Sequence, residues 1–179
     1  MVGALLLSSL VAYAGAPRPR VCLVSLSLPE DLPVAQGRAL RTTLEQALQR
    51  DRAIAHVPAA AFEKAASKLE IAEADRAKAG SVSEIAYELE LDVAVLVFLT
   101  RHDKKLRLLL AAVDPFDGHQ LATASRWLEQ PQVSAKDARA TVQTLLGETL
   151  KTLHQEQTEP PPPPPPPPPA PQSLPQPEP

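Results

Sequence analysis

The sequence has little cysteine, glycine or aromatic residue, and each shortage excludes a class of protein. Its single cysteine, Cys22, cannot form an intrachain disulfide or contribute to a multi-cysteine zinc site. The six glycines never cluster, so there is no glycine-rich loop to hold a phosphate. Aromatic residues make up 3% of the chain and the net charge is −3, which fits neither a base-stacking platform nor a surface for polyanions. Nucleic acid is therefore not an expected partner.

Catalytic and metal-binding patterns are also missing. The four histidines, His56, His102, His119 and His154, have no metal-ligand spacing, and no nucleophile elbow or paired carboxylates occur in an apolar context. A turn containing Asp114, Asp117 and His119 could bind a cation, but aspartates and glycine are typical of a solvated hairpin turn. We therefore expect no enzyme, no cofactor and no metal site.

The first 16 residues resemble a secretory signal peptide. The apolar stretch at 4–12 is short for a membrane span, and small residues around Ala14 fit an A-x-A cleavage site. No Lys or Arg precedes the stretch, which departs from the usual signal and leaves a first core strand or buried helix as the alternative. The pattern predicts a periplasmic or secreted protein with no transmembrane span once residues 1–16 are removed.

Residues 21–154 are expected to form one domain organised around Val93–Leu99, seven consecutive apolar residues. Such a run predicts a strand that is buried on both faces, with protein above and below. Apolar and polar periodicity predicts the remaining elements. We expect strands at 21–28, 53–57, 93–100, 106–113 and 120–128. We expect helices at 34–50, 58–69, 81–89 and from 134 onward, with a loosely packed helical stretch at 70–78 that continues the second of them.

Three local signals set the expected helix boundaries. Gly80 is expected to end a loosely packed helix at 70–78, and Ser81 with Glu84 to form a capping box for the next helix. Ser134 is expected to cap the last helix. The element order β-α-β-α-α-β-β-β-α predicts the α/β (α+β) class, with helices packed on a mixed sheet of about five strands.

The stretch from Leu91 to Gly118 resembles a known group of bacterial envelope domains. An aspartate (Asp92) precedes the buried strand, a charged hairpin follows, and Val113-Asp114-Pro115-Phe116-Asp117-Gly118 comes before a strand of small residues. This pattern is similar to the TolB amino-terminal domain, CsgG and the penicillin-binding-protein activator lipoproteins, although Asp117 stands where threonine is usual. The resemblance implies a non-enzymatic envelope domain that docks onto other proteins.

Five basic residues of one hairpin are the candidate partner contact: Arg101, His102, Lys104, Lys105 and Arg107. A solvated turn would explain them equally simply, and the sharper hypothesis is contact with an acidic envelope protein or an anionic envelope polymer. Trp127, the single tryptophan, is expected to pack in the core or at a strand edge, with an exposed interface anchor as the alternative.

Residues 155–179 are expected to form a proline-rich disordered tail. Ten consecutive prolines at 160–169 favour polyproline II, because proline lacks the donor that helices and sheets need. The tail could be a ligand, a spacer or an inert end. The sequence as a whole predicts an exported interaction or adaptor module. The alternative is a periplasmic domain that binds or hydrolyses a small molecule at a site we do not recognise.

Overall fold

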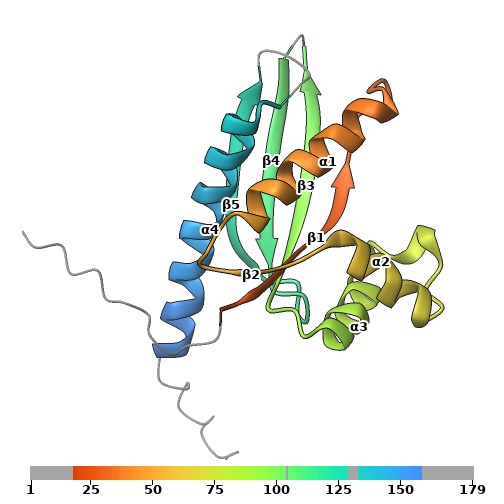
Figure 1. The fold of residues 1–179 in the computed structure, drawn as a ribbon, viewed down its shortest axis with the longest axis vertical. Helices are drawn as coiled ribbons and strands as arrows, with labels where there is room; N and C mark the ends of the chain where they lie inside the picture. Colours follow the sequence, from red (N-terminus) through yellow and green to blue (C-terminus); the bar gives the residue numbers. More distant parts are fainter. Residues whose placement is uncertain (1–17, 104, 129–132, 159–179) are drawn as a thin grey trace, which may run out of the picture.

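The structure is a computed structural model that describes residues 18–103, 105–128 and 133–158, with side chains up to residue 155. Its centre is a five-stranded mixed sheet with the strand order β2-β1-β3-β4-β5 (Figure 1). The predicted class and element order are confirmed. The strands are β1 (Arg20–Ser27), β2 (Ala55–Val57), β3 (Val93–His102), β4 (Lys105–Val113) and β5 (Gln120–Leu128), and the helices are α1 (Val34–Gln49), α2 (Ala59–Lys68), α3 (Ala79–Leu89) and α4 (Ala135–Thr158).

Chain connectivity explains the mixed sheet. β1 pairs in parallel with β2 and β3, because helices connect these strands, whereas β3, β4 and β5 form an antiparallel meander joined by short turns. Asp92, the aspartate before the central strand, joins the two halves. Its carboxylate accepts a hydrogen bond from the backbone N–H of Arg20 at 2.6 Å, and its own N–H donates to the Arg20 carbonyl at 3.0 Å.

One face of the sheet is covered along its whole length by α1 and α4 (Figure 1). The predicted apolar stripes of both helices are buried there; Leu44 of α1 and Leu145 of α4 are at most 1% exposed. Beneath them lie alternate side chains of β3 and β4, including Val95 and Leu108. Burial of these aliphatic side chains contributes about 1.5–3 kcal/mol each. This face therefore holds the main core.

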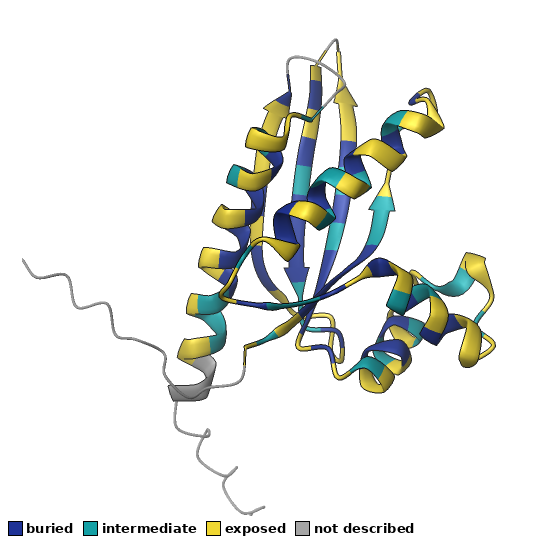
Figure 2. Cartoon of the chain, in the orientation of Figure 1, coloured by how far each residue is buried: buried dark blue, intermediate teal, exposed yellow. Residues whose placement is uncertain are grey.

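The other face is covered only at one end. α2 and α3 pack beside the start of β1 and β3, where Cys22, Phe62, Ile85 and Ala94 form a second, smaller core. Figure 2 shows the change in burial along the strands. The prediction that Val93–Leu99 is buried on both faces is therefore partly wrong, because Leu96 and Phe98, which point to this second face, keep intermediate exposure.

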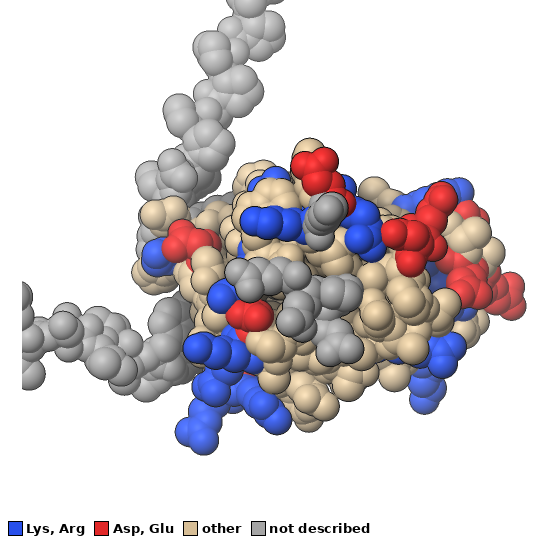
Figure 3. Space-filling model, turned by 90° about the horizontal axis from the view of Figure 1, so that it is seen from above, with Lys and Arg blue, Asp and Glu red and all other residues tan. Residues whose placement is uncertain are grey.

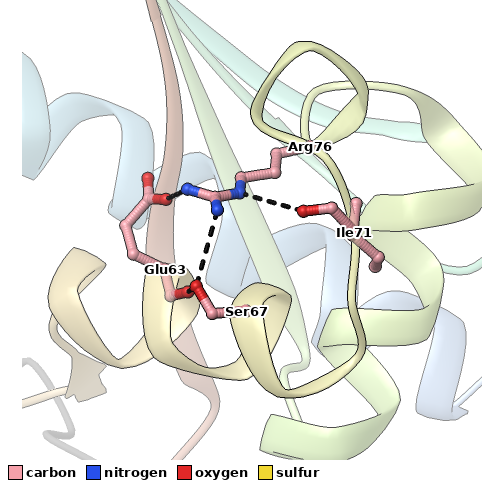
Figure 4. A network of polar contacts seen from close by, with 4 residues as sticks. All are labelled: Glu63, Ser67, Ile71 and Arg76. Atoms are coloured by element: carbon pink, nitrogen blue, oxygen red, sulfur yellow. Dashed lines mark hydrogen bonds and ion pairs between the residues drawn. The ribbon is translucent and has the colours of Figure 1, made fainter.

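The segment between α2 and α3 also differs from the prediction. Residues 70–78 are not an α-helix; they contain a short 3₁₀ turn, Glu73–Asp75. α2 ends where Glu70 adopts a left-handed conformation (φ 57°). The segment is then held against α2 by Arg76, whose guanidinium pairs with Glu63, contacts Ser67 and donates to the Ile71 carbonyl (Figure 4). Tertiary contacts replace the helix that the alanine-rich composition predicts.

The boundaries of α3 and α4 test three predicted signals. Gly80 does not end a helix: α3 begins at Ala79, and the N–H of Val82 donates to the carbonyl of Lys78, the residue before the helix. The pair Ser81 and Glu84 consequently lies inside α3 and caps nothing. In α4 the prediction is confirmed, because the Ser134 hydroxyl accepts the N–H of Asp137 at 3.1 Å.

The two ends of the chain reach or exceed the limits of the described residues. α4 continues to Thr158, four residues beyond the domain limit expected at residue 154. The expected signal peptide at 1–16 and the proline run at 160–169 lie outside the described residues. Within the described ranges, no helix combines the length and apolar character needed to cross a membrane.

Candidate partner-binding face

The basic hairpin lies at the end of the sheet far from α2 and α3. β3 and β4 extend almost to its tip, pairing His102 with Lys105 and Thr100 with Arg107. Because successive side chains of a strand point to opposite faces, the two strands divide the predicted contact residues between the faces. His102, Lys105 and Arg107 lie on the face that α1 and α4 do not cover, whereas Arg101 lies on the covered side. Lys104 is outside the described residues.

Arg101 is engaged within the domain. Its guanidinium lies 3.0 Å from the carboxylate of Asp31, which belongs to the loop between β1 and α1. This pair is partly exposed, so it adds at most about 1 kcal/mol, but it orients Arg101 toward that loop and away from the other basic side chains. That all five residues contact one partner remains a prediction. The structure places three of them, His102, Lys105 and Arg107, on the same face.

Trp127 joins these three residues from the neighbouring strand. It pairs with Arg107 in the register of β4 and β5, and its side chain is 53% exposed. The Arg107 guanidinium lies 5.8 Å from the indole centroid and also donates to the Ser125 hydroxyl at 3.3 Å. The His102 ring lies 6.1 Å from the indole. We call His102, Lys105, Arg107 and Trp127 the hairpin patch.

This arrangement holds Trp127 in place without burying it. A cation over an indole at an exposed site contributes about 0.5–1 kcal/mol. Of the two alternatives for Trp127, the structure places it at a strand edge, on β5, with half of its surface exposed. Amphipathic aromatic and arginine side chains in this setting are typical interface anchors.

An apolar band continues from the hairpin patch toward α2 and α3. It consists of the register neighbours Phe98 and Leu109, followed by Leu96 and Ala111. Small hydroxyl side chains line both sides of the band, from β1 on one side and β5 on the other: Ser25, Ser27, Thr123 and Ser125. The face is therefore apolar along its centre, polar along its edges and basic at the hairpin end.

Charge on the hairpin end is not uniform. Figure 3 looks onto this end and shows Lys and Arg side chains in several groups, with acidic side chains between them. At the start of α4, for instance, Arg126 lies 2.8 Å from Asp137 while Lys136 and Arg139 are exposed. This end therefore presents local groups of opposite charge and not one uniform basic surface.

The turn between β4 and β5 uses its carboxylates for its own backbone. The Asp114 carboxylate accepts the N–H of Phe116 at 2.7 Å, and the Asp117 carboxylate accepts the N–H of His119 at 2.6 Å. Asp117 thus provides a local side-chain acceptor where the resembling group has threonine. Gly118 has φ +75°, which explains the glycine of this motif. No cluster of three potential metal-ligating side chains occurs among the described residues.

A shallow cavity of about 360 Å³ lies between this turn and the end of α3. Tyr87, Glu88, Glu90 and Phe116 line it, and both aromatic rings are largely exposed. Glu88 pairs with Lys68 at 2.5 Å and Glu90 approaches Arg20 at 3.8 Å, so both carboxylates already have cationic neighbours. This cavity contains no pair of groups arranged for nucleophilic catalysis.

Two titratable side chains lie within the fold. Burial raises the pKa of the Cys22 thiol to about 12, with Glu45 adding to the shift, so the thiol stays protonated and unreactive. Burial also lowers the pKa of His56 on β2, against the opposing effect of Glu45. Cys22 belongs to the smaller core and both residues are far along the sheet from the hairpin patch, so they serve packing.

Sequence reasoning missed the apolar band as a site. Phe98 belongs to the apolar run Val93–Leu99, which was expected to be buried on both faces, and no role was predicted for Leu109. One observation could have indicated it. Apart from the helices that became α1 and α4, no predicted helix was long enough to cover the second face along its whole length. Trp127 on a strand of alternating polarity was the positive signal.

Comparison with known proteins supports the fold. No protein-family model and no curated protein matches the chain. The LpoB C-terminal domain from Escherichia coli is similar in structure, with a TM-score of 0.51 at 16% identity over 67% of this chain and 90% of that chain. The Salmonella enterica LpoB domain gives 0.49 at 11% (65% and 87%), and lipoprotein GNA1162 from Neisseria meningitidis gives 0.45 at 14% (79% and 96%).

At these identities the comparison concerns fold alone. It supports the fold that the resemblance implies and does not single out TolB or CsgG. About two thirds of this chain, 67%, thus shares the fold of the LpoB C-terminal domain from Escherichia coli.

Proposed function

We propose that this protein is an exported, non-enzymatic adaptor of the bacterial envelope, which binds another envelope protein through the open half of its sheet. The observation that carries this proposal is the hairpin patch beside the apolar band. A half-exposed tryptophan, an arginine stacked on it and an adjoining strip of partly exposed aliphatic side chains are the components of a protein interface.

Its chemistry favours an acidic or amphipathic partner surface. Lys105 and Arg107 offer cations at one end, and Phe98 and Leu109 offer apolar area next to them. The arrangement suits a partner that places a carboxylate near the hairpin and an apolar strip along the band. An anionic envelope polymer would use the cations alone, and it would leave the apolar band without a role.

The test is capture from a bacterial envelope extract with matched charge variants. The double variant Lys105→Glu with Arg107→Glu reverses two charges on the hairpin patch. The control variant Lys136→Glu with Arg139→Glu makes the same change at the exposed start of α4, on the other side of the sheet. We expect a protein that the wild type and the control retain and the hairpin variant releases, with weaker retention at higher salt.

Equal capture by all three chains would overturn the proposed face. Retention of protease-resistant anionic polymer in place of a protein would assign the hairpin patch to that polymer. Trp127→Ala separates the two results further, because it removes apolar and cation–π contact without changing charge.

The second candidate function is binding of a small molecule at the cavity beside α3. Its supporting observation is the pair of exposed rings, Tyr87 and Phe116, with two carboxylates between them. Such a site would suit an organic cation. Loss of ligand binding in Tyr87→Ala, with capture of the envelope protein intact, would favour this candidate over the adaptor.

A further inference from the structure

The open half of the sheet is long and narrow. Its rows run from Leu96 and Ala111, through Phe98 and Leu109, to Arg107 and Trp127. β3 and β4 are each paired with a strand on both sides, so an occupant that lies over them contacts their side chains and not their backbone groups. The available groups are an indole with its N–H donor, hydroxyls along both sides, and cations at one end.

These groups match an extended proline-rich chain. Such segments bind aromatic-lined surfaces, because proline rings pack on flat aromatic faces and the polyproline II backbone offers carbonyls to donors such as indole N–H and hydroxyl. Proline has no N–H, so a proline run cannot add to a strand edge. The sequence contains such a run, at 160–169.

The exit of α4 places this run within reach. The Thr152 hydroxyl donates to the Leu121 carbonyl at 3.1 Å, which sets the end of α4 beside the start of β5. The pair Arg126–Asp137 sets the beginning of α4 beside the other end of β5. α4 therefore ends at the end of the sheet opposite the hairpin patch, and β5 runs from that end toward Trp127.

The lengths agree. Residues 159–179 span about 65 Å as polyproline II, at about 3.1 Å per residue. The path back from Thr158 to the level of Thr152 is about 9 Å of helix at 1.5 Å per residue. From Leu121 to Trp127 along β5 is about 20 Å at 3.3 Å per residue. The segment is long enough to round the edge of the sheet and lie along the open face.

Charge is complementary as well. The only charged side chains in residues 159–179 are Glu159 and Glu178, and Lys and Arg are absent from them. The hairpin patch contributes Lys105 and Arg107. When the segment runs from the α4 end toward the hairpin, Glu178 lies about 62 Å along it from Thr158, which is more than enough chain to reach the basic end of the face.

We propose that the proline segment, residues 159–179, docks on the open half of its own sheet, with prolines against Trp127 and the apolar band. This inference rests on the face identified in the proposed function and deepens it, because the segment competes there with the partner. Intramolecular attachment gives an effective concentration on the order of millimolar, so a weak contact suffices. A partner must displace the segment.

The single tryptophan makes the contact measurable without a partner. We compare acrylamide quenching of Trp127 in the full chain with quenching in a full-length variant whose prolines 160–169 are replaced by an equal number of Gly and Ser residues. We expect quenching to be about twofold faster in the variant, because a docked segment covers an exposed ring. A synthetic peptide of residues 159–179, added to the variant, should restore slow quenching.

Two further variants and a dilution series complete the test. Leu109→Ser, in the apolar band, should give fast quenching, whereas Lys136→Glu, outside the face, should leave it slow. Equal quenching in the full chain and the Gly/Ser variant overturns the inference. Protection that disappears on dilution also overturns it, because it shows docking between copies of the chain.

The inference and the proposed function fail in different ways. If Lys105→Glu with Arg107→Glu abolishes partner capture while quenching is the same with and without the prolines, the adaptor face stands and the docked segment does not. If the quenching difference is present while all variants capture the same proteins, the docked segment stands and the adaptor face does not.

Discussion

The two faces of this sheet are covered to different extents, and side chains of the same type differ in burial between them. On β4, Leu108 faces α1 and α4 and is fully buried, while its neighbour Leu109 faces the uncovered side and is partly exposed. On the second side of the sheet, Phe62 of α2 is buried in the smaller core, while Trp127 of β5 lies half exposed at the far end. The difference shows that an apolar side chain on this sheet has a structural role where a helix covers it and is available for binding where none does.

The largest contrast concerns Phe62 in the smaller core and Trp127 in the hairpin patch. Phe62→Ala should lower the free energy of unfolding by about 4 kcal/mol, because it leaves a cavity in the smaller core. Trp127→Ala should lower it by about 1 kcal/mol, since it removes an exposed cation–π contact. Urea unfolding followed by circular dichroism measures both. Equal losses would mean that Trp127 is part of the core.

Leu108 and Leu109 allow the loss of stability on truncation to be compared for the same residue type on the two faces of the sheet. Leu108→Ala should cost about 3 kcal/mol and Leu109→Ala about 1 kcal/mol, because only the first opens a closed cavity. Urea midpoints of the two variants, with unchanged slopes, give the difference. A Leu109 variant as unstable as the Leu108 variant would show that the second face is covered in solution.

Replacing a glycine by alanine should have opposite effects on stability in the turn after β4 and in helix α4. Gly118→Ala should destabilise by about 1 kcal/mol, because Gly118 has φ +75°. Gly147→Ala, in the exposed middle of α4 where an added methyl group meets nothing within 4 Å, should stabilise by about 1 kcal/mol. Thermal unfolding of both variants should show shifts of opposite sign.

The smallest expected effect is a pH dependence of folding stability caused by His56 on β2. Burial lowers the pKa of His56 below its ordinary value of 6.5. Below pH 6.5 the unfolded chain therefore binds a proton more readily than the folded chain, and stability decreases as the pH falls from 6.5 toward the lowered value. His56→Gln should flatten this part of the stability profile. An unchanged slope in the variant would assign the pH dependence to other groups.

Much of the fold could be predicted because periodicity reports on it directly. The stripes of α1 and α4 at residues such as Leu44 and Val142, and the alternation along β4, each follow from one buried face. The helix expected at 70–78 was wrong because alanine-rich composition measures intrinsic propensity, whereas Glu70 and Arg76 fix this segment through a left-handed residue and side-chain bonds that sequence spacing does not reveal.

The candidate site was predictable only in part. The basic hairpin was visible as a cluster of charges, but its division between faces depends on how far the strands extend toward the tip. With β3 continuing to His102, strand alternation separates Arg101 from Arg107. The apolar band could not be predicted, because Phe98 has the same sequence pattern whether a helix covers it or not.

The position of β1 has a consequence for the order of assembly. β1 is the first strand along the chain, yet it lies inside the sheet between β2 and β3, and its partner residue Asp92 follows Arg20 by 72 positions. The meander β3-β4-β5 closes through short turns and can form early, whereas β1 must wait for contacts across a long loop. A chain that emerges from its amino terminus can therefore pair β1 with the short β2 only, and the other edge of β1 stays unpaired until β3 has followed.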